Sequence, residues 1–242
     1  MANVTTPRPV VHLDRDAAEA VAPGVFVQHQ LPEIDESPLS LDAVFLDPGS
    51  VFETSGSAAD EIIFVQSGSV DATVNGNTEA LLRGGAMHLI EESSAQLVAG
   101  DKGAQLFKFI IGRSADEHAP LGEYQAFNHT DFSDLDVATS NRSFQILFGP
   151  QNGSYYATFF VGIVPPGAAP QHFHQYDEIV ILSEGEITFH QPTLSVPAKI
   201  GTAFRILPRD LHINENTSKS EDLIELGIFT PAGSPSAAYM AR

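Results

Sequence analysis

Residues 167–185 read GAAPQHFHQYDEIVILSEG and contain the most specific pattern in the sequence. His172 and His174 are separated by one residue, so on an extended strand both imidazoles leave the same face. Glu178 follows and opens the run EIVIL, whose β-branched and apolar residues predict a buried strand that ends at a turn before Gly185. Two imidazoles and a carboxylate aimed at one point are costly to bury alone, and a divalent metal ion is the simplest partner.

The segment GTAFRILPRDLHINEN, residues 201–216, supplies one more candidate ligand. The run FRIL predicts a strand, Pro208 predicts a turn, and the run LHIN, which contains His212, predicts a second strand. Three imidazoles and one carboxylate are borderline ligands that suit divalent Fe, Mn, Ni, Co, Cu or Zn, and affinity order alone does not select among these metals. The sequence therefore predicts one divalent transition metal and leaves its identity open.

The two segments resemble the two sequence motifs of the cupin family. The first reads HxHx3Ex6G without adjustment, and the second places Gly201 eleven residues before His212 and Asn216 four residues after it. The resemblance implies a small jelly-roll β-barrel that holds one metal ion. It implies the following metal ligands: His172, His174, Glu178 and His212.

The two halves of the chain share one sequence register. A constant offset of 117 residues relates 60–63 (DEII) to 177–180 (DEIV), Gly84 to Gly201, and 106–107 (LF) to 223–224 (LI). A shared register at three separate anchors indicates a duplicated unit. With short apolar runs between Gly- and Pro-containing turns, this predicts an all-β chain of two tandem cupin barrels.

Changes in composition set the predicted domain boundaries. We expect an N-terminal arm over 1–23, a first barrel over 24–113, a polar linker over 114–141 and a second barrel over 142–242. In the first barrel Ser55, Ser57 and Ala95 occupy the three histidine positions, and only Glu61 keeps a ligand-type side chain. One carboxylate does not hold a metal ion, so we expect the first barrel to be structural and to cover apolar surface and sheet edges of the second.

The overall composition excludes several classes of partner. A formal net charge of −19 argues against binding to nucleic acid or to an anionic membrane, because both require attraction to phosphate. The absence of cysteine excludes disulfides and thiolate ligands. No stretch of eighteen apolar residues occurs, so a cytoplasmic protein is the expectation. The expected partner is a small-molecule substrate, with dioxygen in an oxidative reaction, and a homodimer is one assembly that the sequence leaves open.

The predicted pocket wall is mostly apolar. Residues that share a strand face with the metal ligands should line it. These residues are Val180, Leu182, Phe204, Ile206 and Asn214. Such a lining accepts an aromatic or aliphatic substrate whose oxygens chelate the metal.

The resemblance leaves three classes of function open. The favoured class is a metal-dependent dioxygenase, similar to quercetinase-like cupins, acting on an enediol, catechol, diketone or flavonol; Glu178 would be both a ligand and the catalytic proton acceptor. The alternative is an isomerase, epimerase or lyase in which the ion acts only as a Lewis acid on a sugar acid or hydroxy acid. A non-catalytic ligand-binding protein comes third. The first class is favoured because the predicted pocket has few basic residues, and Arg205, in the FRIL strand, has the parity that points it away from the metal.

Overall fold

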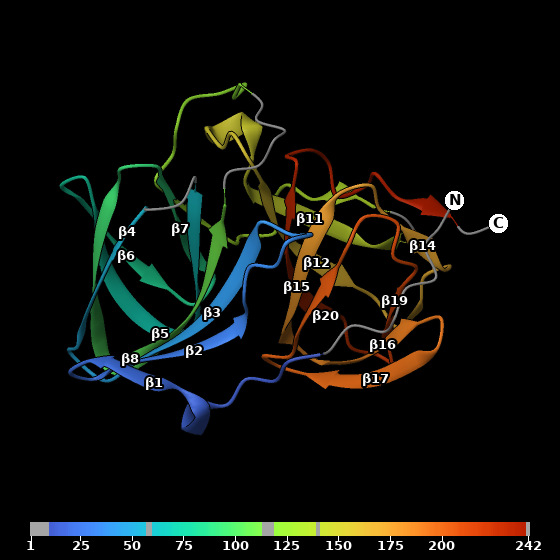
Figure 1. The fold of residues 1–242 in the computed structure, drawn as a ribbon, viewed down its shortest axis with the longest axis horizontal. Helices are drawn as coiled ribbons and strands as arrows, with labels where there is room; N and C mark the ends of the chain where they lie inside the picture. Colours follow the sequence, from blue (N-terminus) through green and yellow to red (C-terminus); the bar gives the residue numbers. More distant parts are fainter. Residues whose placement is uncertain (1–9, 57–59, 113–118, 139–140, 241–242) are drawn as a thin grey trace.

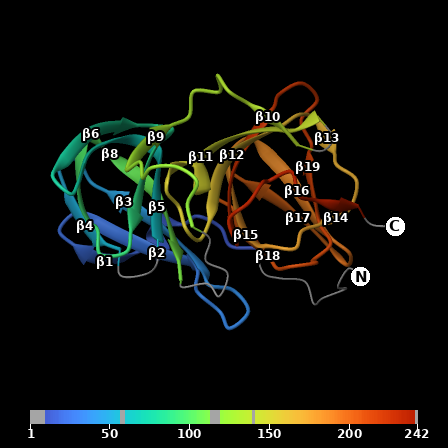
Figure 2. The same cartoon turned by 90° about the horizontal axis from the view of Figure 1, so that it is seen from above.

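The computed structural model describes residues 10–56, 60–112, 119–138 and 141–240. Within these ranges the regular structure is β-strand, apart from two short 3-10 turns, η1 (Arg15–Ala17) and η3 (Pro150–Asn152). Figures 1 and 2 show two barrel-like bodies side by side, the first half coloured blue to green and the second yellow to red. The predicted all-β architecture is confirmed. None of the helical segments in the described ranges has the length and apolar character needed to cross a bilayer.

The first half forms one large antiparallel sheet that curls into a barrel (Figure 1). Its main path runs β1-β2-β3-β8-β5-β7-β9, with β4 paired to β8 and β6 paired to β5. The strands are β1 (Glu19–Ala22), β2 (Val25–Leu31), β3 (Leu39–Leu46), β4 (Val51–Ser55), β5 (Asp60–Val74), β6 (Asn77–Leu82), β7 (Gly85–Ile90), β8 (Ser94–Ile111) and β9 (Phe127–His129).

The second half divides its strands among three sheets. A six-stranded sheet has the order β10-β11-β12-β20-β15-β18, a four-stranded sheet has the order β13-β19-β16-β17, and β14 pairs with β21. The strands are β10 (Asp136–Val137), β11 (Ser143–Phe148), β12 (Thr158–Val164), β13 (Gly167–Ala168), β14 (His172–Phe173), β15 (Asp177–Glu184), β16 (Glu186–Gln191), β17 (Leu194–Lys199), β18 (Ala203–Ile206), β19 (Ile213–Asn216), β20 (Leu223–Thr230) and β21 (Tyr239–Met240).

The strand β5 is longer than the sequence predicts. The runs EIIFVQSG (61–68) and SVDATVN (69–75) predict two separate strands, yet the pairing with β8 continues through both, with register shifts on both sides of Gly68. Gly68 has φ of 76°, and a Cβ there would lie 2.0 Å from the carbonyl oxygen of Gly103. Only glycine fits that close approach, so the strand bends at a bulge and passes on into the next wall of the barrel.

The predicted linker and arm both carry strand pairing. Within 119–138, β9 adds to the edge of the first sheet by pairing with β7. In the predicted arm, Val11 forms an antiparallel bridge with Ala203 of the second half, and η1 and β1 follow. Both predicted connecting segments therefore pair with strands of the barrels. The domain boundaries stay a prediction.

Hydrogen bonds between the halves follow the 117-residue register. The Ser37 hydroxyl donates to the Asp177 carboxylate, and at the related positions Ser154 Oγ donates to Asp60 Oδ2 at 3.0 Å. Gln66 and Ser183, themselves 117 residues apart, exchange two further bonds of 2.9 and 2.7 Å. Bonds that repeat with the two halves exchanged indicate an approximate two-fold relation between the barrels.

A shared apolar core joins the two halves behind the functional cavity. Phe64 and Phe109 of the first half both pack against Phe159 of the second, with ring centroids 6.1 and 5.1 Å apart. The same buried cluster includes Ile179 on β15, the strand that carries Glu178. Burial of this much aromatic surface fixes the outer face of β15, so its opposite face is held toward the inside of the second barrel.

Candidate metal centre

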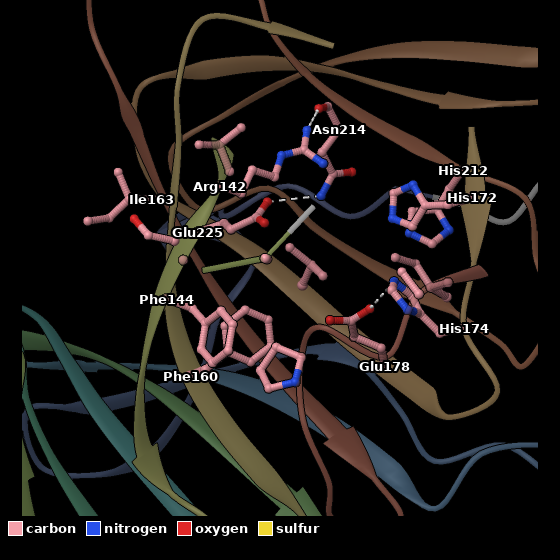
Figure 3. A pocket seen from close by; sticks show the side chains of 18 of the residues that line it. Arg142, Phe144, Phe160, Ile163, His172, His174, Glu178, His212, Asn214 and Glu225 are labelled. Atoms are coloured by element: carbon pink, nitrogen blue, oxygen red, sulfur yellow. Dashed lines mark hydrogen bonds and ion pairs between the residues drawn. The ribbon is translucent and has the colours of Figure 1, made fainter. Parts of the chain in front are cut away.

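Two neighbouring segments of the second barrel bring three histidines together. His172 lies in β14, His174 follows that strand, and His212 directly precedes β19. His212 N donates to His172 O at 3.0 Å, and the reciprocal bond is 3.3 Å, so the two segments run antiparallel at this point. One ligand nitrogen from each imidazole lies within 4.8 Å of the other two. Figure 3 shows the three rings gathered on one side of the cavity.

Backbone carbonyl groups fix the tautomer of each imidazole. Nδ1 donates to Pro170 O in His172 (3.0 Å), to Asp210 O in His212 (2.9 Å) and to Ala237 O in His174 (3.4 Å). A carbonyl oxygen can only accept, so Nδ1 carries the hydrogen and Nε2 is left with a free lone pair. This is the outer hydrogen-bonding arrangement that orients metal-binding histidines. The donor set therefore fits a divalent transition ion.

The electrostatic surroundings keep the three imidazoles neutral. Burial lowers the pKa of His212 well below its usual value, and the neighbouring His172 and His174 lower it further. Burial likewise lowers the pKa of His172, and it lowers the pKa of His174 to about 4. Neutral imidazole is the form that binds a metal ion, so the triad is prepared for binding at neutral pH.

We expect His174 in the metal-free protein to stay neutral until the pH falls to about 4. A histidine whose pKa is depressed on folding binds its proton more readily in the unfolded chain, so its contribution to stability is lost as pH falls below about 6.5. An NMR titration of the imidazole nitrogens measures this directly. Titration of His174 near pH 6.5 would contradict this description.

The Glu178 carboxylate lies beside the triad. It is buried on β15, with Oε2 at 3.8 Å from His174 Nε2. Among the described residues, the set of donor atoms that all lie within 4.8 Å of one another contains the three histidines without Glu178. Burial raises the pKa of Glu178 well above its usual value, and the nearby Glu225 and Asp177 raise it further. The three predicted histidine ligands converge, and the role of Glu178 as a fourth ligand stays a prediction.

A small cavity of about 60 Å³ adjoins the triad and Glu178. Pro235 and Ala238 lie at its wall, in the segment that leads into β21 and across the histidines. Its apolar wall consists of Phe144, Phe160, Ile163, Val164, Val180 and Ile206, and its polar side chains away from the triad include Arg142, Asn214 and Glu225 (Figure 3).

Three of the five predicted pocket residues line this cavity. Val180, Ile206 and Asn214 do so, whereas Leu182 and Phe204 lie in the packed core of the barrel. Phe204 stacks on Phe189 with ring centroids 4.0 Å apart. Residues two apart on a strand share a face but sit almost 7 Å apart along it, so only those nearest the ligands reach the cavity.

The cation in the cavity is Arg142, which the sequence did not single out. Arg205 has the orientation that its parity predicts: its guanidinium donates to Leu39 O at 2.6 Å and Pro32 O at 2.9 Å in the other half. Arg142 directly precedes β11 and lines the cavity, as does Glu225 on β20. The one sequence signal for Glu225 was its charge, because it lies within the apolar run LIELGIF at a strand position that faces the interior.

The first barrel holds an internal ammonium at the corresponding place. Lys108 Nζ lies 3.0 Å from Glu61 Oε2, and Thr54 Oγ1 donates to the same oxygen at 2.9 Å. Lys108 lies 117 residues before Glu225, so a lysine stands where the second barrel has a carboxylate. Ser55 and Ala95 lie on β4 and β8 without ligand groups, and Ser57 lies outside the described residues. The one carboxylate expected to remain is therefore already paired.

Replacing Lys108 by Met should destabilise the protein by roughly 3 kcal/mol, because Glu61 would be left as a buried and unpaired charge. Urea unfolding of the purified variant measures the change. The double variant Lys108→Met/Glu61→Gln should recover most of the loss, since both charges are then removed. A single variant within about 0.5 kcal/mol of the parent protein, the range of an ordinary surface substitution, would show that the pair is not needed.

Comparison with known proteins identifies the fold. No family model and no curated protein matches the sequence. Among solved structures, the chain is similar to a single-substitution variant of the oxalate decarboxylase OxdC from Bacillus subtilis, with a TM-score of 0.74, 15% identity and coverage of 99% of this chain and 81% of that one. It is also similar to AerE from Microcystis aeruginosa, with a TM-score of 0.70, 13% identity and coverage of 88% and 95%.

A third similar structure is a cupin 2 conserved barrel domain protein from Leptotrichia buccalis, with a TM-score of 0.59 and 13% identity over 88% of this chain and 91% of that one. At such identities a structural likeness speaks for the fold and not for the reaction. The reciprocal contacts at a 117-residue spacing and the long coverage agree with the motif resemblance. The chain has the bicupin fold, two tandem cupin barrels in one polypeptide.

Proposed function

We propose that the chain is a metal-dependent enzyme that moves a proton on a small, oxygen-bearing acid. The observation that carries the proposal is the convergence of three buried imidazoles, each with Nδ1 bonded to a carbonyl oxygen, beside a buried carboxylate. His172, His174 and His212 would hold the ion, with Glu178 as the expected fourth ligand. When bound, the ion would supply Lewis-acid polarisation of substrate oxygens or, if it is redox-active, electron transfer to dioxygen.

Glu178 is the proton acceptor in this proposal. It borders the cavity, and its Oε2 lies 3.8 Å from His174 Nε2, which is too far for a hydrogen bond. A buried carboxyl group whose pKa is raised well above its usual value is suited to returning a proton that it has accepted. The apolar side chains around it exclude water, which keeps a proton taken from the substrate available for return.

Arg142 changes the balance between the two enzyme classes. The oxidative class is favoured by the sequence because no cation is expected to face the substrate. Arg142 does line the cavity, so the reason for that preference is removed. A guanidinium in a small cavity suits a carboxylate-bearing substrate. We therefore place the isomerase, epimerase or lyase class first.

A dioxygenase is the second candidate, and a specific feature of the cavity favours it. Phe144, Phe160 and Ile163 form an apolar wall opposite Glu178 (Figure 3). Such a wall suits dioxygen and the ring of a catechol or diketone. The cavity of about 60 Å³ is far below the several hundred Å³ typical of drug-sized ligands, which counts against a flavonol.

The two classes separate in one experiment on metal-reconstituted protein. Under strictly anaerobic conditions in D2O, small hydroxy acids should incorporate deuterium at the carbon next to the carboxylate, detected by proton NMR. Heat-treated protein with the same metal content is the control. Oxygen uptake with catechols or diketones, without any anaerobic exchange, would overturn the first choice in favour of the dioxygenase.

A further inference from the structure

A polar cluster stands in the cavity across from the histidine triad. Arg142 Nη2 donates to the backbone carbonyl oxygen of Asn214, and Asn214 Nδ2 donates to Glu225 Oε2 at 2.9 Å. Figure 3 shows Arg142 and Glu225 on one side, the three histidines on the other, and Asn214 between them. Arg142 directly precedes β11, Asn214 lies on β19 and Glu225 lies on β20, so three separate parts of the barrel converge on this cluster.

One buried acceptor in this cluster has no protein partner. Asn214 is 6% exposed, its amide nitrogen is used by Glu225, and its Oδ1 is buried without any hydrogen bond. A buried acceptor left unpaired is destabilising, so the position calls for a donor. A hydroxyl group on a ligand in the cavity would supply one.

With Glu178 and Glu225 both ionised and a divalent ion bound at the triad, the formal charges of the cavity favour a monoanionic ligand. Arg142 contributes +1, Glu178 and Glu225 contribute −2 when ionised, and the imidazoles are neutral, which leaves −1. A divalent ion at the triad changes the sum to +1, and a monoanion then makes the closed cavity neutral. Buried charges are tolerated when they are paired, so the balanced state is favoured.

The first barrel balances its internal charge with an ion pair between two of its own side chains. Its Lys108, at the position related to Glu225, forms an ion pair with Glu61 inside the barrel. That pair sums to zero, so no ion or anion is needed there. The second barrel has carboxylates, Glu178 and Glu225, at both of the related positions, so other cations must balance them. Arg142 is one such cation.

We propose that Arg142 and Asn214 form a binding subsite for a small hydroxy-monocarboxylate, whose carboxylate faces the Arg142 guanidinium and whose hydroxyl donates to Asn214 Oδ1. The inference rests on the proposed function in one respect, because the metal ion completes the charge balance. The volume of about 60 Å³ restricts the ligand to a few non-hydrogen atoms. Glu225 positions the Asn214 amide and sets the net charge, without contacting the carboxylate.

Calorimetric titration of zinc-loaded protein tests the subsite without relying on turnover. Glycolate carries both groups, glycolamide replaces the carboxylate by a neutral amide, and acetate lacks the hydroxyl. We expect glycolate to bind about tenfold or more tightly than either analogue, since hydrogen bonds to charged groups are stronger than those between neutral groups. Equal affinity for glycolate and glycolamide in the parent protein would overturn the proposal.

Three variants assign the preference to named side chains. Arg142→Gln should weaken glycolate about tenfold to hundredfold and leave glycolamide nearly unchanged. Glu225→Gln should have the opposite effect and raise the affinity for glycolate, an increase that a misfolded variant would not show. Asn214→Ala should abolish the preference for glycolate over acetate. Arg83→Gln, at an exposed arginine paired with Glu184, is the matched control and should change nothing.

The outcomes separate this inference from the proposed function. Parent protein that takes up no zinc at the triad would overturn the proposed function itself. Parent protein with one zinc ion per chain and an Arg142→Gln variant that binds glycolate as tightly as the parent would overturn the subsite alone. One zinc ion per chain in every variant, with the opposite shifts for Arg142→Gln and Glu225→Gln, supports both.

Discussion

His212→Ala is expected to lower the metal affinity of the protein by more than about 100-fold, because loss of an outer hydrogen-bonding partner alone typically costs 10- to 100-fold. His212 is central to the geometry of the histidine triad. Its backbone forms the bridge to His172, its Nδ1 is bound to Asp210 O, and its ring lies 4.4 and 5.1 Å from the rings of His172 and His174. Alanine keeps the bridge and removes the imidazole.

The measurement is metal content after dialysis against a weak chelator, with circular dichroism to verify the fold. His190→Ala is the matched control, since His190 lies in the same barrel and bonds to Ser195 and Glu215 outside the cavity. The control should keep the metal content of the parent. Full occupancy in both His212→Ala and the corresponding His172→Ala variant would contradict the assignment of the triad.

Glu178→Gln is expected to lower turnover by about 10²- to 10⁴-fold, the range that a positioned acid or base contributes. Glutamine keeps the size of the side chain and can neither accept nor return a proton. Removing the carboxylate from the proposed ligands should lower the metal affinity, but part of the metal should stay bound because the three imidazoles remain. Turnover should therefore be compared at equal metal occupancy.

Metal content and rate measured on the same sample distinguish proton transfer from metal loss. Glu186→Gln is the matched control, since Glu186 is exposed at the start of β16 in the same barrel. If Glu178→Gln at equal occupancy turns over as fast as the parent, Glu178 has no catalytic role. It would then act only as a ligand or as a neighbour of His174.

Much of the histidine triad could be predicted because its spacing reflects local geometry. His172 and His174 lie close in sequence on one extended segment, and the motif containing His212 has its own turn signal. The duplication was also visible, since anchors such as Asp60 and Asp177 keep their register in sequence. Both features can be recognised in the sequence, the first from local residue spacing and the second from the repeat between the two halves.

The rest of the cavity depends on contacts that no short pattern encodes. Arg142 belongs to the segment before β11 and reaches the cavity only because β11 pairs beside β12. Leu182 shares the face of Glu178 and Val180 but lies deeper, in the barrel core. Parity gives the face of a strand, whereas the depth at which a cavity ends is set by packing from other strands. The bend of β5 at Gly68 was missed for a related reason, since a bulge and a turn use the same residues.

An anomalous-difference map from a crystal of the zinc-loaded protein locates the bound ion directly. We expect one strong peak per chain, between the Nε2 atoms of His172, His174 and His212, and none in the first barrel beside Lys108 and Glu61. Absence of a peak at the three imidazoles, with zinc present elsewhere in the crystal, would contradict the assignment of the metal to the second barrel.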